Sequence, residues 1–334
     1  MNRNRSGTAA TGPPGLLRVA GLRVLFGPAA RPAPAVDGVD FEIGAGEAVA
    51  LAGESGCGKT LTALALTRLT PEPGSVCEGR IEWEGRSVLD LPERALQRLR
   101  GGGIAYVFQD PLSALNPVQR IGTQVAEAVR LHAPRAPIRE RVLDCLRRVG
   151  LPDPPRQAAA FPHELSGGMR QRAMIAMAIA CRPRLLVADE PTTALDPTVR
   201  GRILDLLDDL RRAFGMALLL ITHDIAVAER VADRLLVMYA GRVVEEGPVD
   251  ALLRCPAHPY TRALLDARPG AVPPGCRLPG ILGAVPRAED WPAGCRFHPR
   301  CPSARPDCAR RDPVSAVTGP GRRAACRYPL ATRG

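Results

Sequence analysis

Apolar residues recur along this chain with two different periods, which separate predicted strands from predicted helices. Apolar and polar residues alternate over Leu17 to Phe26 and Val39 to Ile43, and Glu47 to Ala52 is a short apolar run before Gly53. A period of two is typical of strands that bury one face. The spacing becomes helical from Lys59 to Leu69. This part of the chain is therefore predicted to run strand, glycine-rich turn, helix.

The middle of the chain is predicted to be mostly helical. Helical spacing covers Val118 to His132 and Ile138 to Val149, with a proline-rich break between them. Predicted helices and strands then alternate: helix Met169 to Ala180, strand Arg184 to Ala188, helix Pro197 to Phe214 and strand Met216 to Thr222. Such alternation indicates a parallel sheet covered on both faces.

The two ends of the chain lack clear periodicity. Residues 1–15 are polar and are predicted to be a disordered arm. Beyond Gly241 the chain is proline-rich and is predicted to be irregular. Because 334 residues exceed the ~250–300 at which single cores tend to divide, we expect a main domain at 16–250, with a helical insertion at about 111–180, and an extension at 251–334.

Composition narrows the class of protein. A net charge of +11 would permit nucleic-acid or membrane-surface binding, but aromatic residues are only 4% and the basic residues are scattered, so a nucleic-acid partner is not expected. No apolar run approaches the ~20 residues of a membrane span, and no signal-like stretch follows the basic start. We expect a cytoplasmic protein. Lys59 is the only lysine, which indicates a position that needs a compact point charge.

One segment matches a phosphate-binding loop in full. The sequence Gly53-Glu54-Ser55-Gly56-Cys57-Gly58-Lys59-Thr60 has the form G-x-x-x-x-G-K-[ST] between a predicted strand and helix. Its glycines let backbone N–H groups face phosphates. Lys59 is predicted to contact the β- and γ-phosphates of ATP, and Thr60 a Mg²⁺ ion. The alternative is an ordinary glycine-rich turn. Cys57 near a helix N-terminus suggests a lowered thiol pKa.

Two adjacent acids follow an apolar strand. The run from Leu185 to Ala188 ends in Asp189 and Glu190, where strand alternation alone would not place carboxylates. Asp189 is predicted to hold Mg²⁺ through water, and Glu190 to act as general base on the attacking water. The alternative is that either acid caps the element that follows.

A third segment completes a family pattern. Leu165-Ser-Gly-Gly-Met-Arg-Gln171 precedes a predicted helix and lies some twenty residues before the paired acids. With the phosphate loop it resembles the signature of the ATP-binding cassette (ABC) family. The resemblance implies an α/β P-loop ATPase with a mixed or parallel sheet, a helical subdomain insertion and a small irregular cysteine-containing C-terminal extension. It also implies that Ser166, Gly167 and Gly168 complete the ATP site of a second cassette.

Further roles are implied by the same resemblance. Gln109 matches the glutamine that contacts Mg²⁺ and water, and His223 the histidine that contacts the γ-phosphate, so Glu190, His223, Gln109 and Lys59 form the expected catalytic set. Asp196, in the segment 194–196, matches the loop that contacts the partner cassette. Phe26 is the candidate for stacking on adenine, with a core aromatic as the alternative.

Three stretches resemble one subfamily. Phe108 to Pro117, Phe161 to Arg172 and His258 to Leu265 are similar to the bacterial dipeptide/oligopeptide and nickel importers. The resemblance implies a peripheral subunit at the cytoplasmic face of the inner membrane that powers peptide import. Its implied partners are a homologous, non-identical cassette, two transmembrane permeases and an extracytoplasmic solute-binding protein. Import of nickel or another solute, an exporter cassette and a soluble ABC ATPase remain alternatives.

Four cysteines crowd the C-terminal extension. Cys295, Cys301, Cys308 and Cys326 lie in a proline-rich segment, and disulfides are disfavoured in a reducing compartment. Four thiolates suit either Zn²⁺ or an iron–sulfur cluster, although no C-x₂₋₄-C pair typical of zinc sites occurs among them. The subfamily resemblance implies a [4Fe–4S] cluster, with Zn²⁺ or free thiols as alternatives. The centre is predicted to staple a tail that is poor in apolar residues.

Overall fold

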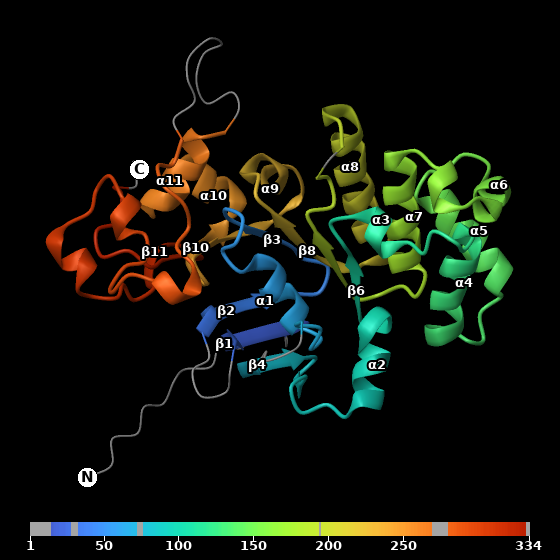
Figure 1. The fold of residues 1–334 in the computed structure, drawn as a ribbon, viewed down its shortest axis with the longest axis horizontal. Coiled ribbons are helices and arrows are strands. Elements are labelled where there is room, and N and C mark those ends of the chain that lie inside the picture. The colour runs from blue at the N-terminus through green and yellow to red at the C-terminus, as the bar shows by residue number, and fades with distance from the viewer. Residues whose placement is uncertain (1–14, 28–32, 72–75, 194, 269–279, 332–334) are drawn as a thin grey trace.

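The computed structural model describes residues 15–27, 33–71, 76–193, 195–268 and 280–331. The expected disordered arm, apart from residue 15, lies outside these ranges, as do Ala194 and Cys276. In Figure 1 two sheets occupy the centre of the molecule, with a helical layer at one end and the C-terminal extension at the other.

The smaller sheet is antiparallel. Its strand order is β2-β1-β4-β5, and the strands are β1 (Leu17–Phe26), β2 (Ala33–Ile43), β4 (Val76–Trp83) and β5 (Arg86–Ser87). The helix α1 (Lys59–Ala65) lies between this sheet and the larger one (Figure 1). A shared apolar core fills the space between the two sheets.

The larger sheet is mixed, with the order β11-β12-β10-β9-β3-β8-β7-β6. Its strands are β3 (Ala48–Ala52), β6 (Ile104–Val107), β7 (Leu185–Asp189), β8 (Ala217–Thr222), β9 (Arg234–Tyr239), β10 (Arg242–Pro248), β11 (Ala316–Gly319) and β12 (Arg322–Ala324). The run from β9 to β6 is parallel and the other three strands are antiparallel. The predicted α/β class with a mixed or parallel sheet is confirmed.

The interiors of the parallel strands are apolar because both of their faces are covered, and polar residues occur only at strand ends, such as Asp189 in β7 and Thr222 in β8. In β7, Leu186 and Ala188 pack into the core shared with the helical layer, whereas Leu185 and Val187 pack toward the antiparallel sheet. All four side chains are buried. The strand therefore holds its last residues in a fixed place.

Helices cover the sheets and form the layer at one end. They are α2 (Glu93–Gly102), α3 (Pro111–Ala114), α4 (Ile121–His132), α5 (Ile138–Arg148), α6 (Pro154–Ala159), α7 (Gly167–Ile179), α8 (Pro197–Phe214), α9 (Ile225–Val231), α10 (Val249–Arg254) and α11 (Pro259–Asp266). Short 3₁₀ helices cover Pro162–Glu164, Ala288–Asp290, His298–Arg300 and Pro306–Ala309. None of the helices in the described ranges combines the length and apolarity needed to cross a membrane.

The prediction of an irregular chain beyond Gly241 was wrong in part. The segment contains β10, α10, α11, β11 and β12, and β12 pairs with β10 so that Glu245 lies opposite Ala324. These elements are too short for a visible period, and the pairing joins residues about eighty positions apart. An aromatic cluster of Tyr239, Tyr260 and Phe297 packs the extension onto β9.

Candidate functional site

The glycine-rich loop between β3 and α1 is pressed against its neighbours. A Cβ atom on Gly53 would lie 2.2 Å from the carbonyl oxygen of Met238 in β9, and one on Gly58 would lie 2.9 Å from the carbonyl oxygen of Ala35. No larger residue fits at either position without moving backbone. The close approach fixes the path of the loop.

Lys59 lies inside the curl of this loop. Its side chain is buried, and its Nζ donates to the carbonyl oxygens of Gly53 at 2.7 Å and Glu54 at 2.9 Å. The ammonium group is therefore held at the centre of the loop by backbone acceptors. Any stronger anionic acceptor that enters the loop can replace them.

Asp189 ends β7 beside the loop. Burial raises the pKa of its carboxyl group, while a hydrogen bond from Thr60 and the charge of Lys59 act in the opposite direction. Its Oδ1 is buried and has no hydrogen-bond partner among the described residues. A buried carboxylate oxygen without a partner, next to a threonine hydroxyl, suits a hydrated Mg²⁺ ion.

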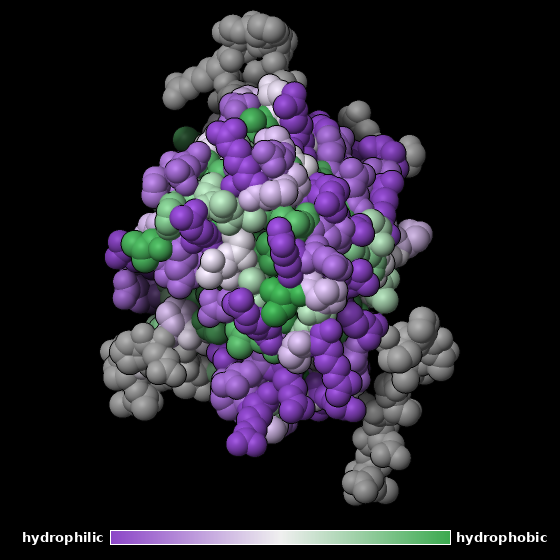
Figure 2. Space-filling view, turned by 90° about the vertical axis from the view of Figure 1, so that its right-hand side faces the viewer, coloured by the Kyte–Doolittle hydropathy of each residue, from purple (hydrophilic) through white to green (hydrophobic). Residues whose placement is uncertain are grey.

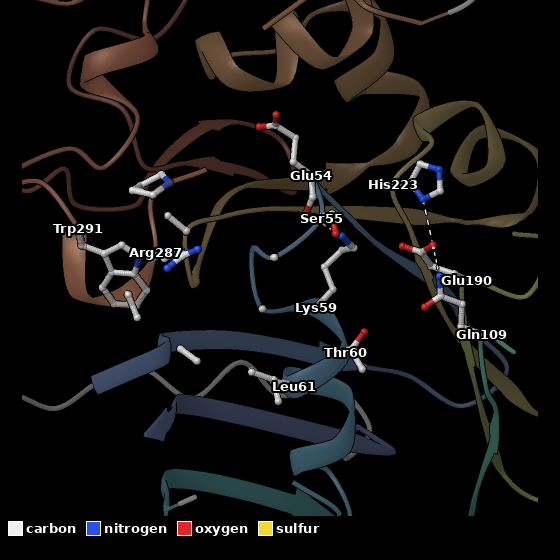
Figure 3. A pocket seen from close by; sticks show the side chains of 16 residues that line it. Glu54, Ser55, Lys59, Thr60, Leu61, Gln109, Glu190, His223, Arg287 and Trp291 are labelled. Atoms are coloured by element: carbon white, nitrogen blue, oxygen red, sulfur yellow. Dashed lines mark hydrogen bonds and ion pairs between the residues drawn. The ribbon is translucent and has the colours of Figure 1, made fainter. Parts of the chain in front are cut away.

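The carboxylate of Glu190 contacts three polar side chains. Its Oε2 accepts hydrogen bonds from Nε2 of Gln109 at 3.3 Å and Oγ1 of Thr193 at 2.9 Å, and it lies 3.1 Å from Nδ1 of His223. Glu190 has a φ of 45°, a left-handed conformation that is uncommon outside glycine. Gln109, Glu190 and His223 follow β6, β7 and β8, whose carboxyl ends meet at one edge of the sheet (Figure 3).

These side chains share one cavity of about 790 Å³. The predicted residues in its lining are Glu54, Ser55, Gly56, Gly58, Lys59, Thr60, Gln109, Glu190 and His223. Further lining residues that the sequence did not point to are Ala35, Leu61, Ala240, Pro286, Arg287, Ala288 and Trp291. The structure thus brings the loop and the three strand-end residues together, and adds a wall from the C-terminal extension.

Among the residues predicted to bind nucleotide within one chain, Phe26, Gly53 and Cys57 do not line this cavity. Phe26 is half-buried and packs against the core between the two sheets. Cys57 is buried beneath the loop, where its Sγ would lie 2.9 Å from a Cβ on Gly53. Burial raises the pKa of the Cys57 thiol, so the prediction of a lowered pKa was wrong. The thiol points into protein and gains little from the nearby helix.

The predicted signature segment lies on the surface away from this cavity. Ser166 caps α7, its Oγ accepting from the N–H of Met169 at 3.3 Å. Asp196 caps α8 in the same way, accepting from the N–H of Val199 at 2.9 Å. A Cβ on Gly168 would lie 3.0 Å from Val199, so the two caps are neighbours. Ser166, Gly167, Gly168 and Asp196 are absent from the cavity lining.

The C-terminal extension contacts the phosphate loop directly, through Glu54. Arg300 donates from Nη1 and Nη2 to the two carboxylate oxygens of Glu54, at 2.7 and 2.9 Å, and its side chain is buried. The hydroxyl of Tyr260 accepts from the backbone N–H of Glu54 at 2.9 Å. The sequence pattern gave no sign of these contacts, because the partners are more than 200 residues apart.

A second link joins the extension to β2. Asp37 pairs with Arg23, Arg242 and Arg296, and only Arg296 comes from the extension. Burial opposes ionisation of Asp37, but hydrogen bonds and charge from Arg242 and Arg296 hold its pKa below the usual value. Burial lowers the pKa of Arg296 to about 10. The pairs hold the extension, the antiparallel sheet and β10 together.

The four clustered cysteines share a separate small pocket. Cys295, Cys301, Cys308 and Cys326 all line it. Burial raises the pKa of Cys326 to about 11, and it also raises the pKa values of Cys295 and Cys301, which favours neutral thiols. Within the described ranges no group of three or more His, Cys, Asp or Glu side chains is placed to hold a metal ion. The arrangement does not by itself support the predicted iron–sulfur or zinc centre.

Comparison with known proteins adds two family matches. The profile described as "ABC transporter" matches residues 36–193, and the profile "Oligopeptide/dipeptide transporter, C-terminal region" matches residues 244–308. The chain is 44% identical to "Dipeptide transport ATP-binding protein DppD" of Escherichia coli, over 94% of this chain and 97% of that protein. It is 47% identical to "Probable peptide ABC transporter ATP-binding protein y4tR" of Sinorhizobium fredii, over 87% and 88%.

Two solved structures of ATP-binding cassettes resemble about 70% of this chain. A structure described as a dimeric post-hydrolysis state of the ATP-binding cassette MJ0796, bound to ADP and Pi, aligns with a TM-score of 0.62 at 29% identity and covers 70% of this chain and 98% of that one. The cbiO1 protein of Clostridium perfringens, part of an ABC transporter complex, aligns with a TM-score of 0.61 at 28% identity, over 71% and 90%.

Proposed function

Since this chain belongs to the ATP-binding subunits of ABC transporters, whose cassettes hydrolyse ATP, we propose that it powers the import of di- or oligopeptides. The observation that carries the proposal is the alignment with a dipeptide transport subunit over 94% of the chain, extension included. A cassette shared with exporters or soluble ATPases would not account for the match at residues 244–308. Nickel or another solute remains the second candidate cargo, from the sequence resemblance alone.

The cavity supports ATP hydrolysis through positioning and charge. Lys59 leaves its loop carbonyls for the β- and γ-phosphates, and Glu190 takes a proton from the attacking water. Gln109 and His223 hold the Glu190 carboxylate from either side, and His223 reaches the γ-phosphate. Mg²⁺ bound with ATP would neutralise phosphate charge. The side chains that would hold it are Thr60 and Asp189, whose Oδ1 has no hydrogen-bond partner among the described residues.

A second cassette is required to complete the site. Ser166, Gly167 and Gly168 lie outside the cavity of their own chain, on a surface shared with Asp196. A helix cap that exposes backbone N–H groups suits a partner's phosphates. We expect a head-to-tail pair in which each signature segment closes the other chain's cavity, with a homologous, non-identical partner.

Permeases are expected to dock on the helical insertion. The segment after β6 exposes Phe108, Leu112 and Val118, whose exposed fractions are 41%, 58% and 79%. Figure 2, which faces the helical layer, shows apolar residues gathered among hydrophilic ones on that side. Gln109 lies within the same segment, so movement of a docked membrane helix would reach Glu190 through one hydrogen bond. The exposed apolar segment supports a peripheral position at the cytoplasmic face of the inner membrane, beside permeases that would receive solute from an extracytoplasmic binding protein.

The four-cysteine pocket is proposed to hold a [4Fe–4S] cluster, with Zn²⁺ as the alternative. The donor set of four thiols on one pocket supports this, whereas the present side-chain placement does not, so the thiols would have to turn and ionise to bind. Absorption spectra and metal analysis of anaerobically purified protein test the proposal. If the purified protein contained neither iron nor zinc, the four cysteines would be free thiols and the proposed cluster would be wrong.

The function is tested by uptake of labelled dipeptides, oligopeptides and nickel in the native organism carrying Glu190→Gln. Selective loss of peptide uptake is the expected result. A matched control is Glu229→Gln, because Glu229 is an exposed carboxylate that pairs with Arg268 at 3.5 Å and does not line the cavity. Loss of nickel uptake alone would transfer the assignment to nickel, and unchanged uptake of every solute would overturn the importer.

A further inference from the structure

The extension supplies one wall of the nucleotide cavity. Pro286, Arg287, Ala288 and Trp291, which we call the tail wall, line the same cavity as Lys59 and the hydrolytic residues. The tail wall lies outside the residues matched by the cassette profile and inside those matched by the C-terminal one. No role for it follows from the phosphate-loop motif.

The order of residues across the cavity indicates which part of a bound nucleotide would contact the tail wall. Figure 3 shows Glu190, Gln109 and His223 at one side, Lys59 and Thr60 in the middle, and Arg287 and Trp291 at the opposite side. Attack on the γ-phosphate fixes that phosphate beside Glu190. The rest of the nucleotide must then extend past Lys59 toward the tail wall.

The indole of Trp291 is held in place before any ligand arrives. The guanidinium of Arg296 lies 3.4 Å from the centroid of the indole ring. Gly241 packs against the edge of the ring, where a Cβ atom would lie 2.7 Å from a ring carbon. Arg296 is itself fixed by Asp37 and by the carbonyl oxygen of Ala240. A fixed aromatic surface loses little conformational entropy on binding.

Arg287 complements the indole. Its side chain is 84% exposed, and its ion pair with Glu289 is long at 3.9 Å, so the guanidinium is available to a ligand. A planar cation and an aromatic ring on one wall match a purine ring and its ribose hydroxyls. By contrast, Phe26 packs against the core and does not line the cavity.

We propose that Trp291 and Arg287 bind the adenosine part of the nucleotide, so that the C-terminal extension determines nucleotide affinity. This inference rests on the proposed ATPase function. It assigns to the extension a direct contact with the substrate of the cassette. The phosphates depend on the loop, and the base depends on the tail wall.

The test compares MgADP with Mg-pyrophosphate, which lacks a nucleoside. Trp291→Ala should weaken ADP binding about tenfold and leave pyrophosphate binding unchanged, because only ADP carries a base. Arg287→Ala, at an exposed position that tolerates truncation, should weaken ADP binding several-fold, and Trp291→Phe should restore most of the affinity. Unchanged ADP affinity in Trp291→Ala and Arg287→Ala, or an equal loss for pyrophosphate, would overturn the proposal.

Intrinsic fluorescence gives an independent measurement. The chain has two tryptophans, and Trp83 is buried, so a Trp83→Phe protein reports on Trp291 alone. ADP should change this signal at saturation and pyrophosphate should not. A wild-type chain that binds neither ligand would overturn the ATPase assignment itself, whereas ADP binding without a Trp291 signal overturns only the tail-wall contact.

Discussion

The two sides of the nucleotide cavity are built by opposite means. The phosphate side comes from a short contiguous motif and from three residues at the ends of adjacent parallel strands. The tail side comes from residues 286–291, which follow all of these residues in the sequence and are held to the cassette by Arg296 and Arg300. Local sequence determines the first, and long-range ion pairs determine the second.

This difference separates chemistry from positioning. Substitutions on the phosphate side should change turnover, since Glu190 and its neighbours act on the reacting water. Substitutions on the tail side should change affinity or stability and leave turnover at saturating ATP almost intact.

Glu190→Gln should have the largest effect. The variant keeps the hydrogen-bonding shape and removes the base, so kcat should fall by about 10²–10⁴ while nucleotide affinity stays within twofold. Steady-state hydrolysis and ADP titration of the assembled pair provide the measurement. Near-normal hydrolysis by the variant would show that Glu190 is not the general base, and the proposed chemistry of the phosphate side would be wrong.

Asp37→Asn should destabilise the fold by about 3 kcal/mol at pH 7, because three arginines lose their buried anion. The folded pKa of Asp37 is lowered and the unfolded value is about 3.9. The unfolded chain therefore binds more protons at acid pH, so the stabilisation is complete above about pH 4 and is lost as the pH falls through the folded pKa.

Urea unfolding of wild type and Asp37→Asn across this pH range provides the measurement. The gap between the two midpoints should close on the acid side. Asp312→Asn is the matched control, since Asp312 pairs with the same Arg242 but has a side chain that is 53% exposed, and it should cost less than about 1 kcal/mol. Equal losses for both variants would show that the Arg296 link is not a main anchor of the tail.

Arg300→Ala should raise the KM for ATP roughly tenfold with little change in kcat. Without the bidentate pair, Glu54 and the phosphate loop are less restrained, so the loop loses more conformational entropy when it binds phosphates. Arg305→Ala is the control, because Arg305 lies in the same extension and stacks on Tyr328 without touching the loop. Arg300→Lys should recover part of the affinity, since it keeps the charge and loses the fork. A matching fall in kcat would mean that the extension also shapes the chemistry.

The sequence predicted the phosphate side well and the tail side poorly, for physical reasons. Strands β7 and β8 are apolar up to their last residue, and the motif of the loop is contiguous, so a short stretch of sequence is enough to recognise each of them. The Arg300–Glu54 pair joins residues 246 positions apart, and no periodicity marks it. The strands β11 and β12 are four and three residues long and depend on pairing with β10. Arg296 and Arg300 are adjacent in sequence to Cys295 and Cys301, which were predicted metal ligands, but nothing in the sequence indicated a role for the two arginines.

Ser166→Ala should have the smallest effect on the isolated chain. Loss of the cap of α7 costs about 1 kcal/mol, and ADP affinity of that chain should not change, because Ser166 does not line its own cavity. Asp153→Ala removes a comparable cap, that of α6, and serves as control for stability alone. In the assembled pair, Ser166→Ala should lower hydrolysis several-fold and Asp153→Ala should not. If the isolated Ser166→Ala chain lost ADP affinity, the signature segment would contact the nucleotide of its own chain. The cavity would then have a third contributor from the same chain, besides the phosphate side and the tail side.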